Sequence, residues 1–435
     1  MTGIGAVTPL GNSFRSAWEA AKDGVSGIGR ITRFETSLLQ WSIAGELKGF
    51  DAGAYLSPKE IRRLDPFVHY AVAAALMASE DAGLINSLEV RSRKSEVKTK
   101  ENSEFTIPDH LTSAGVIIGS SRGGISTIEK ALMKSARSAS RHSSLITRHI
   151  HRLSPYLMPA TTINMAASYV AQTLGIKGYC LGISNACASG TNAIGEAFRL
   201  VKSGHSSLMI AGGSEAPICR VCVEGYGSAG ALSARMGPSE GAPDSPRPFD
   251  RERDGFVLSE GACVLVLEEY DHALERGAPV YGEVLGYGNC ADAFHMTKPD
   301  SEGEARAMEM AIKEAGVSTD NIDYINTHGT GTKLGDRAET QALHRVFGKR
   351  ASEIPASALK SMTGHMLAAS GALEIASTLM SMKEGIIPPT INLDEKDPEC
   401  DINIITEKKK AGLEIAISNS FGFGGVNAVI VLKRI

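Results

Sequence analysis

The stretch 184–190 (SNACASG) contains Cys187 at a point where an apolar run ends and a helical pattern begins. Residues 179–183 are mostly apolar, and apolar residues recur at three- and four-residue steps over 193–201. These patterns predict that Cys187 lies between a buried strand and the start of a helix. Backbone N–H groups and the helix dipole favour negative charge there, so a thiol should ionise more readily than usual. This stretch alone fits a nucleophile and a buried structural cysteine equally well.

Three further loops combine glycine with side chains that could take part in catalysis. His328 follows a short apolar stretch at 322–326, and Lys360 and His365 precede a helical pattern that ends at Gly385. The last loop, 422–425 (GFGG), contains Phe423. Taken singly, each histidine fits a structural role better than a catalytic one. Together, a thiol and two imidazoles suit acyl transfer, in which backbone N–H donors stabilise the developing oxyanion.

The elements that would position these loops alternate between strands and helices. Helical patterns cover 12–24, with Asn12 as the cap, 59–82 and 302–315; strand patterns cover 114–118, 208–211, 256–268 and 322–326. The glycine loop 119–124 does not have the spacing of a dinucleotide-binding loop. The segment at about 88–110 is rich in charge and poor in large apolar residues, which predicts a solvated insertion; a functional lid is the alternative.

The second half of the chain repeats the first in outline. The helices predicted at 190–204 and 371–385 have the same length, and each follows a loop with polar chemistry. We therefore expect two similar α/β units that build one active site. The first, 1–255, would carry the nucleophile, and the second, 256–435, would carry the His/His/Lys loops.

Composition excludes several classes of function. The chain has 435 residues, 43% of them hydrophobic and 22% charged, with a net charge of −4, so we expect no nucleic-acid or membrane partner. Seven cysteines without framework spacing predict a reducing compartment, and the pair Cys219 and Cys222 has no second pair to complete a metal site. No apolar run reaches membrane-spanning length. We expect a cytoplasmic bacterial protein, with an organellar matrix or stroma as the alternative, and the first strand reads as if a few residues were missing.

Four ordered motifs carry a resemblance to a known family. They are 184–190 (SNACASG), 326–332 (NTHGTGT), 360–365 (KSMTGH) and 419–427 (NSFGFGGVN), with further matches at 213–215, 247–250, 253–256 and 388–392. The chain resembles the β-ketoacyl-acyl carrier protein (ACP) synthases of the elongating type II, KAS I/II-like, in the thiolase superfamily. The resemblance covers nearly the whole chain.

The resemblance implies an α/β, thiolase-like fold with duplicated α/β/α/β/α halves forming a five-layered sandwich, assembled as a homodimer. It implies a 3-oxoacyl-ACP synthase, an acyltransferase that needs no cofactor. Its partners would be acyl-ACP and malonyl-ACP. The reaction would be a decarboxylative Claisen condensation in fatty acid elongation, giving 3-ketoacyl-ACP and CO₂.

The resemblance also implies a role for each site residue. Cys187 would hold the acyl chain, while His328 and His365 would assist decarboxylation and stabilise the enolate. Lys360 would organise the histidines, balanced by Glu374 first and by Asp336 and Glu339 next. The N–H groups of Cys187 and Phe423 would form the oxyanion hole, and Phe423 would gate a pocket lined by Phe421, Thr330 and Thr332. We expect no metal, although some relatives hold a monovalent cation near positions matching Asn326, Glu374, Ser418 and Asn419.

Two features concern partners and specificity. Lys59, Arg62 and Arg63, with a second cluster at Arg148 and Arg152, match the family's docking surface for an acidic carrier protein; a plain solvated face is the alternative. Gly230 replaces an arginine that relatives often use there. Arg122 stands where elongating synthases usually have an apolar residue lining the acyl pocket. An inward side chain would shorten the pocket or pair with an acidic acyl group, whereas an outward one would leave chain length unchanged.

Other members of the superfamily fit less well. A polyketide-type ketosynthase would share the whole site and stays open. A non-catalytic chain-length subunit lacks the cysteine, so Cys187 argues against it. Thiolases use a second cysteine near the C-terminus, and 422–425 contains none. The initiating synthases pair their cysteine with His and Asn, whereas this chain has His365 after Lys360.

Overall fold

Two five-stranded mixed sheets form the framework of the protein. The computed structural model describes residues 1–86, 109–141, 153–235 and 244–435. The first sheet has the order β1 (Gly3–Val7), β7 (Gly261–Glu268), β6 (Leu208–Glu215), β4 (Gly115–Gly119) and β5 (Cys180–Ile183). The second has the order β10 (Ala356–Ser357), β9 (Tyr324–Asn326), β13 (Ile415–Gly422), β14 (Val426–Lys433) and β8 (Glu283–Ala291).

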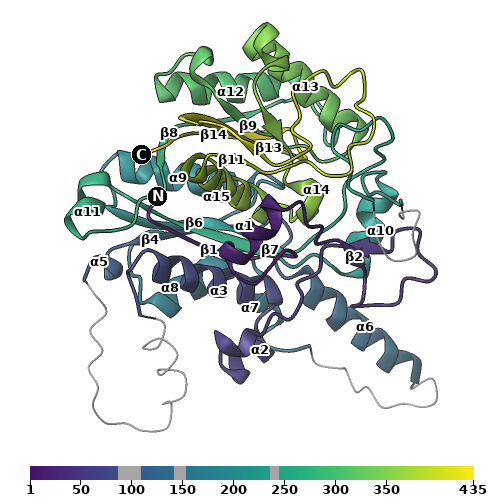
Figure 1. Ribbon diagram of the computed structural model, residues 1–435. Helices are drawn as coiled ribbons and strands as arrows, with labels where there is room; N and C mark the ends of the chain where they lie inside the picture. The colour runs from purple at the N-terminus through teal and green to yellow at the C-terminus, as the bar shows by residue number, and fades with distance from the viewer. Residues whose placement is uncertain (87–108, 142–152, 236–243) are drawn as a thin grey trace.

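Helices separate and cover the two sheets in five layers (Figure 1). The central layer is α9 (Ser189–Lys202) with α15 (Ala368–Glu384), which pack against each other and against both sheets. Helices α3 (Pro66–Asp81) and α8 (Met165–Leu174) cover the first sheet, and α12 (Ser301–Ala315) and α13 (Lys333–Phe347) cover the second. This is the expected thiolase-like α/β/α/β/α sandwich.

Shorter elements connect these layers. The other helices are α1 (Phe14–Lys22), α2 (Pro58–Arg63), α5 (Asp109–Thr112), α6 (Ile125–Arg141), α7 (Leu157–Thr161), α10 (Arg220–Ser228), α11 (Tyr270–Glu275) and α14 (Lys360–Thr363). Two small hairpins pair β2 (Gly29–Arg30) with β3 (Ile43–Ala44) and β11 (Ile386–Ile387) with β12 (Lys409–Lys410).

The central helix α15 is buried on all sides because it packs between the two sheets. Nearly every residue from Ala368 to Leu379 is buried, and a helix that is enclosed in this way has no polar face to present to water. Close approach needs small residues: a Cβ on Gly213 of β6 would lie 2.2 Å from the carbonyl oxygen of Ala368. Glycine at this position therefore brings the start of α15, and with it His365, against the first sheet.

The structure corrects several predicted elements. The helix predicted at 59–82 is two helices, because Asp65 caps α3 through its bond from the Phe67 N–H (3.1 Å) and Pro66 occupies its first position. Ser13, not Asn12, caps α1. The run at 179–183 is not buried: β5 is an edge strand whose side chains are exposed or half-buried. Strand β7 begins at Gly261 rather than at 256.

The remaining expectations on organisation have mixed outcomes. Residues 87–108, which hold most of the charged insertion expected at 88–110, lie outside the described residues. The division at 255/256 stays a prediction; β7, which follows it, pairs with β1 and β6 in the first sheet. Within the described ranges, none of the helices combines the length and apolar character that crossing a membrane requires.

Candidate active site

Cys187 lies in a tight turn between β5 and α9. Ala186, just before it, has a positive φ of 48°, a conformation that a non-glycine residue adopts only when its surroundings hold it there. Ser189 supplies that restraint, since its hydroxyl donates to the Ala186 carbonyl (2.6 Å) and accepts from the Asn185 N–H (2.8 Å). The turn projects the half-buried Cys187 thiol into a cavity of about 460 Å³.

The environment of Cys187 opposes ionisation rather than favouring it. Burial raises the pKa of the thiol to about 11, although the Lys360 ammonium and a hydrogen bond from the Phe423 N–H both lower it. The expectation of a thiol that ionises readily was therefore wrong, because desolvation outweighs the positive charges. The resting nucleophile is a neutral thiol.

Two backbone donors stand beside the thiol, as the oxyanion hole requires. The Phe423 N–H points at Sγ of Cys187. A Cβ on Gly422 would lie 3.3 Å from the Cys187 nitrogen, so the 422–425 loop lies against the nucleophile turn. The backbone at Cys187 and the Phe423 N–H therefore lie next to each other at the thiol, where an oxyanion hole would need its two donors.

Lys360 ties His328 to a buried carboxylate. Its ammonium lies 2.6 Å from Glu374 Oε1, 2.7 Å from the His328 carbonyl oxygen and 3.3 Å from His328 Nδ1. An ammonium has only donors, so Nδ1 of His328 must be the acceptor and the ring proton must sit on Nε2. Burial and the nearby Lys360 charge lower the pKa of His328 well below its usual value, which keeps the ring neutral.

His365 reaches the same tautomer by a different route. The Met366 N–H donates to Ser370 Oγ (2.9 Å), so the Ser370 hydroxyl proton is free to donate to His365 Nδ1 at 3.1 Å. When Ser370 donates, the proton of this neutral ring sits on Nε2, which is buried and has no hydrogen-bond partner within the described chain. Burial, then the Lys360 charge, lower the pKa of His365 well below normal. The two imidazole rings meet edge to face, with centroids 5.5 Å apart.

Asp336 and Glu339 shape the His328 loop rather than pair with Lys360. Glu339 accepts from the N–H groups of His328 (2.8 Å) and Gly329 (2.9 Å), and Asp336 accepts from the Gly331 N–H (3.0 Å). Burial raises the pKa of Glu339 to about 7 and that of Asp336 to about 6. Of the three carboxylates predicted to balance Lys360, the structure places Glu374 in direct contact.

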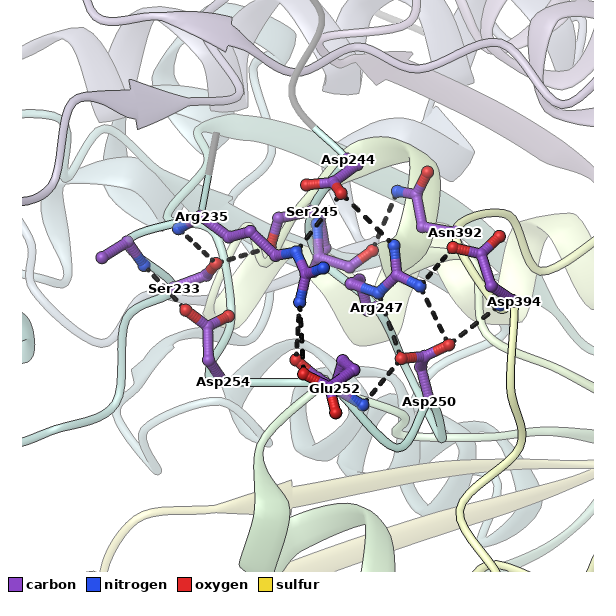
Figure 2. A network of polar contacts seen from close by, with 12 residues as sticks. Ser233, Arg235, Asp244, Ser245, Arg247, Asp250, Glu252, Asp254, Asn392 and Asp394 are labelled. Atoms are coloured by element: carbon purple, nitrogen blue, oxygen red, sulfur yellow. Dashed lines mark hydrogen bonds and ion pairs between the residues drawn. The ribbon is translucent and has the colours of Figure 1, made fainter. Parts of the chain in front are cut away.

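A polar network anchors the segment that supports this loop (Figure 2). Arg247 forms a two-pronged ion pair with Asp250 (3.1 and 3.0 Å) and also contacts Asp394 (2.6 Å). The segment then reaches the site through the Phe249 N–H, which donates to Asp336 Oδ2 at 2.7 Å. The motif at 247–250 is therefore a support for the His328 loop.

The cavity brings the predicted substrate-contacting residues together. Its lining includes Cys187, His328, His365, Thr330, Thr332, Phe421 and Phe423. Thr330 and Thr332 share a hydrogen bond between their hydroxyls (2.9 Å), and Thr332 also caps α13. Two residues that contact this site, Ser370 and Tyr226, were not among the predicted site residues. The first could have been sought one turn into the helix after His365, whereas nothing local marks the second.

Arg122 does not line this cavity. Its side chain is exposed, its Nε donates to the Tyr226 hydroxyl (2.7 Å), and its guanidinium lies 5.1 Å from the Tyr226 ring centre. Tyr226 does line the cavity, 6.3 Å from the Phe423 ring. Arg122 therefore does not point into the cavity but contacts one of its lining residues, Tyr226.

The predicted docking residues lie on α2 and beyond it. Lys59 and Arg62 are exposed, while the Arg63 guanidinium stacks 4.2 Å from the ring centre of Tyr156. Arg148 and Arg152 lie outside the described residues. Gly230 lines the mouth of the cavity.

At all four positions of the family's cation site, buried polar atoms have no hydrogen-bond partner among the described residues. They are both side-chain atoms of Asn326, Glu374 Oε2, Ser418 Oγ and Asn419 Oδ1, and Ser418 pairs with Asn326 across β13 and β9. Oxygen donors of this kind fit a monovalent cation, which would neutralise charge behind Glu374. The described residues contain no group of three His, Cys, Asp or Glu side chains arranged for a metal ion.

The fold and the Cys–His–His cavity define a condensing enzyme of the thiolase-like class. The model of the beta-ketoacyl synthase N-terminal domain matches residues 1–273, and that of the C-terminal domain matches 281–394. The chain therefore belongs to the β-ketoacyl synthase family, and it is an acyltransferase.

Comparison with individual proteins agrees with this assignment. The chain is 40% identical to 3-oxoacyl-[acyl-carrier-protein] synthase 2 of Synechocystis sp., covering 100% of this chain and 97% of the relative. It is 39% identical to the synthase 2 of Vibrio cholerae, covering 100% and 98%. A β-ketoacyl synthase structure from Burkholderia phymatum superposes with a TM-score of 0.85 at 36% identity, covering 100% and 98%.

Proposed function

We propose that this enzyme is a 3-oxoacyl-ACP synthase in which Cys187 carries the acyl chain and His328 and His365 generate the attacking carbanion. The observation that carries the proposal is the shared cavity. It holds a thiol beside two backbone donors and two neutral imidazoles that each present Nε2–H.

The first half-reaction loads the enzyme. Cys187 Sγ attacks the carbonyl carbon of acyl-ACP, and the tetrahedral oxyanion accepts from the N–H groups of Cys187 and Phe423. The bond to the carrier sulfur breaks, and that sulfur leaves with the proton that the Cys187 thiol gives up. Burial raises the pKa of the Cys187 thiol to about 11, so the thiol keeps its proton at rest and gives it up as the new C–S bond forms.

The second half-reaction forms the carbon–carbon bond. The malonyl C–CO₂ bond breaks, CO₂ leaves, and the electron pair moves onto the thioester as an enolate whose oxygen accepts from Nε2–H of His328 and His365. The enolate carbon then attacks the acyl-Cys187 carbonyl. The C–S bond breaks, the product stays on its carrier, and Cys187 takes a proton from solvent. Low histidine pKa values keep both rings neutral donors throughout.

Fatty acid elongation is the pathway that the comparisons favour. The two relatives named 3-oxoacyl-[acyl-carrier-protein] synthase 2 are 39–40% identical over nearly their whole length. The structure titled "The ishigamide ketosynthase/chain length factor" is 31% identical with a TM-score of 0.87. A polyketide-type ketosynthase remains the second candidate, and the cytoplasmic location stays a prediction.

The test uses labelled malonyl-ACP with the variant Cys187→Ala. This variant should release CO₂ but form no 3-ketoacyl product, because the histidines remain while the acyl carrier is lost. His365→Ala should lose both activities. A folded Cys187→Ala enzyme that still condensed acyl-ACP with malonyl-ACP would overturn the proposal.

We also propose that the enzyme is a homodimer whose two copies pair along β5. This strand lies at the edge of the first sheet, where Tyr179 (39% exposed) and Leu181 (37% exposed) face outward. An open edge with apolar side chains is suited to pairing with a second copy. Sedimentation of the intact protein should give twice the monomer mass, and Leu181→Lys should lower that mass. A wild-type monomer at micromolar concentration would contradict this assembly.

A further inference from the structure

Glu304 is a buried carboxyl group in the wall of the substrate cavity that the mechanism above does not use. It lies in the first turn of α12, which Asp300 caps, and its side chain is almost entirely buried. It lines the same cavity as Cys187 and His328, yet its Oε2 is buried and has no hydrogen-bond partner within the described chain.

The other carboxyl groups of this wall are all satisfied by the protein. Asp254 accepts from the Ala234 N–H (3.1 Å), and Asp292 accepts from Asn427 Nδ2 (2.5 Å). Asp336 and Glu339 accept backbone N–H groups, as described above. Five carboxyl side chains line the cavity, and within the described ranges Glu304 is the one among them with a buried oxygen that has no hydrogen-bond partner. A buried polar group normally has a partner from protein, water or ligand, so Glu304 Oε2 is a position at which this wall can bind a group of the substrate.

Its surroundings keep Glu304 uncharged. Burial is the main cause that raises its pKa well above the usual value, and the nearby carboxyl groups of Glu339, Asp292, Asp300 and Asp336 raise it further. These groups come from α13, the end of β8 and the cap of α12. A neutral carboxylic acid carries one O–H donor, so this wall offers the cavity a hydrogen-bond donor rather than a negative charge.

A metal ion is the competing occupant, and the structure speaks against it. The described residues include no group of three His, Cys, Asp or Glu side chains arranged to hold one. The oxygens of Asp336 and Glu339 are already occupied by backbone N–H groups. The remaining kind of partner for the Glu304 carboxyl is a neutral hydrogen-bond acceptor. Resting on the proposed function, the substrate enters as a thioester on a carrier arm, and that arm contains amide groups whose carbonyl oxygens are such acceptors.

We propose that Glu304 is a further substrate-binding residue, which donates a hydrogen bond from its neutral carboxyl group to an amide carbonyl of the carrier arm. The bond would hold the arm against the α12 wall while its thioester end reaches Cys187. Glutamine at this position would preserve the donor, whereas methionine would fill the same space without one.

The test compares two small substrates, malonyl-pantetheine, which has the amide groups, and malonyl butyl thioester, which has none. With Glu304→Met, the KM for decarboxylation of malonyl-pantetheine should rise about tenfold at unchanged kcat, while the KM for the butyl thioester stays constant. Glu304→Gln should keep both KM values within about twofold. Glu302→Met is the matched control, because Glu302 is exposed in the same turn.

The pH profile gives a second readout that a purely structural role would not move. In the wild type, the KM for malonyl-pantetheine should rise at alkaline pH as the Glu304 carboxyl ionises and loses its donor, whereas Glu304→Gln should show no such rise. This comparison decides the question even if Glu304→Met does not fold. The role of Glu304 would be overturned if Glu304→Met changed the KM equally for the two thioesters. It would also be overturned if that variant changed neither KM. A wild type that decarboxylates neither would overturn the proposed function instead.

Discussion

Ser370 Oγ lies 3.1 Å from Nδ1 of His365, and a hydroxyl that donates to Nδ1 leaves the ring proton on Nε2. The hydroxyl accepts from the Met366 N–H, which leaves its own proton available to donate to Nδ1. His328 presents the same nitrogen because the Lys360 ammonium contacts its Nδ1. Two different contacts to Nδ1, from a hydroxyl and from an ammonium, therefore favour the same Nε2–H donor on both histidines.

Removing the Ser370 hydroxyl should weaken catalysis without weakening binding. In Ser370→Ala, His365 can place its proton on either nitrogen, so the enolate loses a donor part of the time. We expect kcat for malonyl-ACP decarboxylation to fall about tenfold with KM unchanged. Ser377→Ala, also buried on α15, is the control. An unaltered kcat would show that Ser370 does not set the tautomer.

The sequence predicted the site better than it predicted the restraints around it. Cys187, Lys360, His328 and His365 lie in short motifs whose order and local elements could be read directly. The roles of Tyr226 and Ser370 could not, because each depends on which side chain packs beside it in three dimensions. Arg122 is an example: the sequence marks its position as unusual, but its contact is with Tyr226, more than a hundred positions away.

Most elements of the fold were likewise predictable from periodicity, and the errors have physical causes. The break between α2 and α3 follows from Pro66, which begins a new helix with Asp65 as its cap. The exposure of β5 could not be inferred, since an apolar edge strand and a buried strand have the same local pattern. Burial also reversed the expected ionisation of Cys187, an effect that no local pattern reports.

Substitutions in the Lys360–Glu374 ion pair should distinguish its effect on stability from its effect on catalysis. Lys360→Met leaves Glu374 buried without its partner and should cost about 3–5 kcal/mol of unfolding free energy. The double variant Lys360→Met/Glu374→Leu should recover most of that loss but remain inactive, because His328 still lacks the contact to Nδ1. Urea unfolding and CO₂ release measure the two effects. An active double variant would show that Lys360 only balances charge.

The reactivity of Cys187 should keep rising far into the alkaline range. Because burial raises its pKa to about 11, the thiolate fraction grows about tenfold per pH unit between about pH 7 and pH 10. Iodoacetamide labelling of the Cys187 peptide, followed by mass spectrometry, should therefore show no plateau in that window. A plateau near pH 8 would mean that the helix start and Lys360 outweigh desolvation.

The contact between Arg122 and Tyr226 should influence acyl chain length, as the position of Arg122 predicted. The guanidinium holds the Tyr226 ring against the cavity, so Arg122→Leu should free that ring and allow longer acyl chains to load. Acylation rates for acyl-ACPs of increasing length provide the measurement. Arg220→Leu, which removes an exposed arginine at the start of α10, serves as the control. Identical chain-length profiles for wild type and Arg122→Leu would leave Arg122 without a role in specificity.

The exposed cations of α2 should matter only when the substrate is attached to its carrier. Acyl carrier proteins present acidic surface, so Lys59→Glu/Arg62→Glu should raise the KM for malonyl-ACP about tenfold at low salt and leave the KM for malonyl-pantetheine unchanged.

Higher ionic strength should reduce the difference in KM for malonyl-ACP between this variant and the wild type, because salt screens exposed charges. Arg63 is left intact, since its guanidinium packs on Tyr156 and its removal would also cost packing. Lys349→Glu, at an exposed lysine of the 3-10 turn Gly348–Ser352 after α13, makes the charge change of one of these two substitutions elsewhere on the surface. If the Lys349 variant raised the KM for malonyl-ACP equally, net charge rather than docking on α2 would explain the effect.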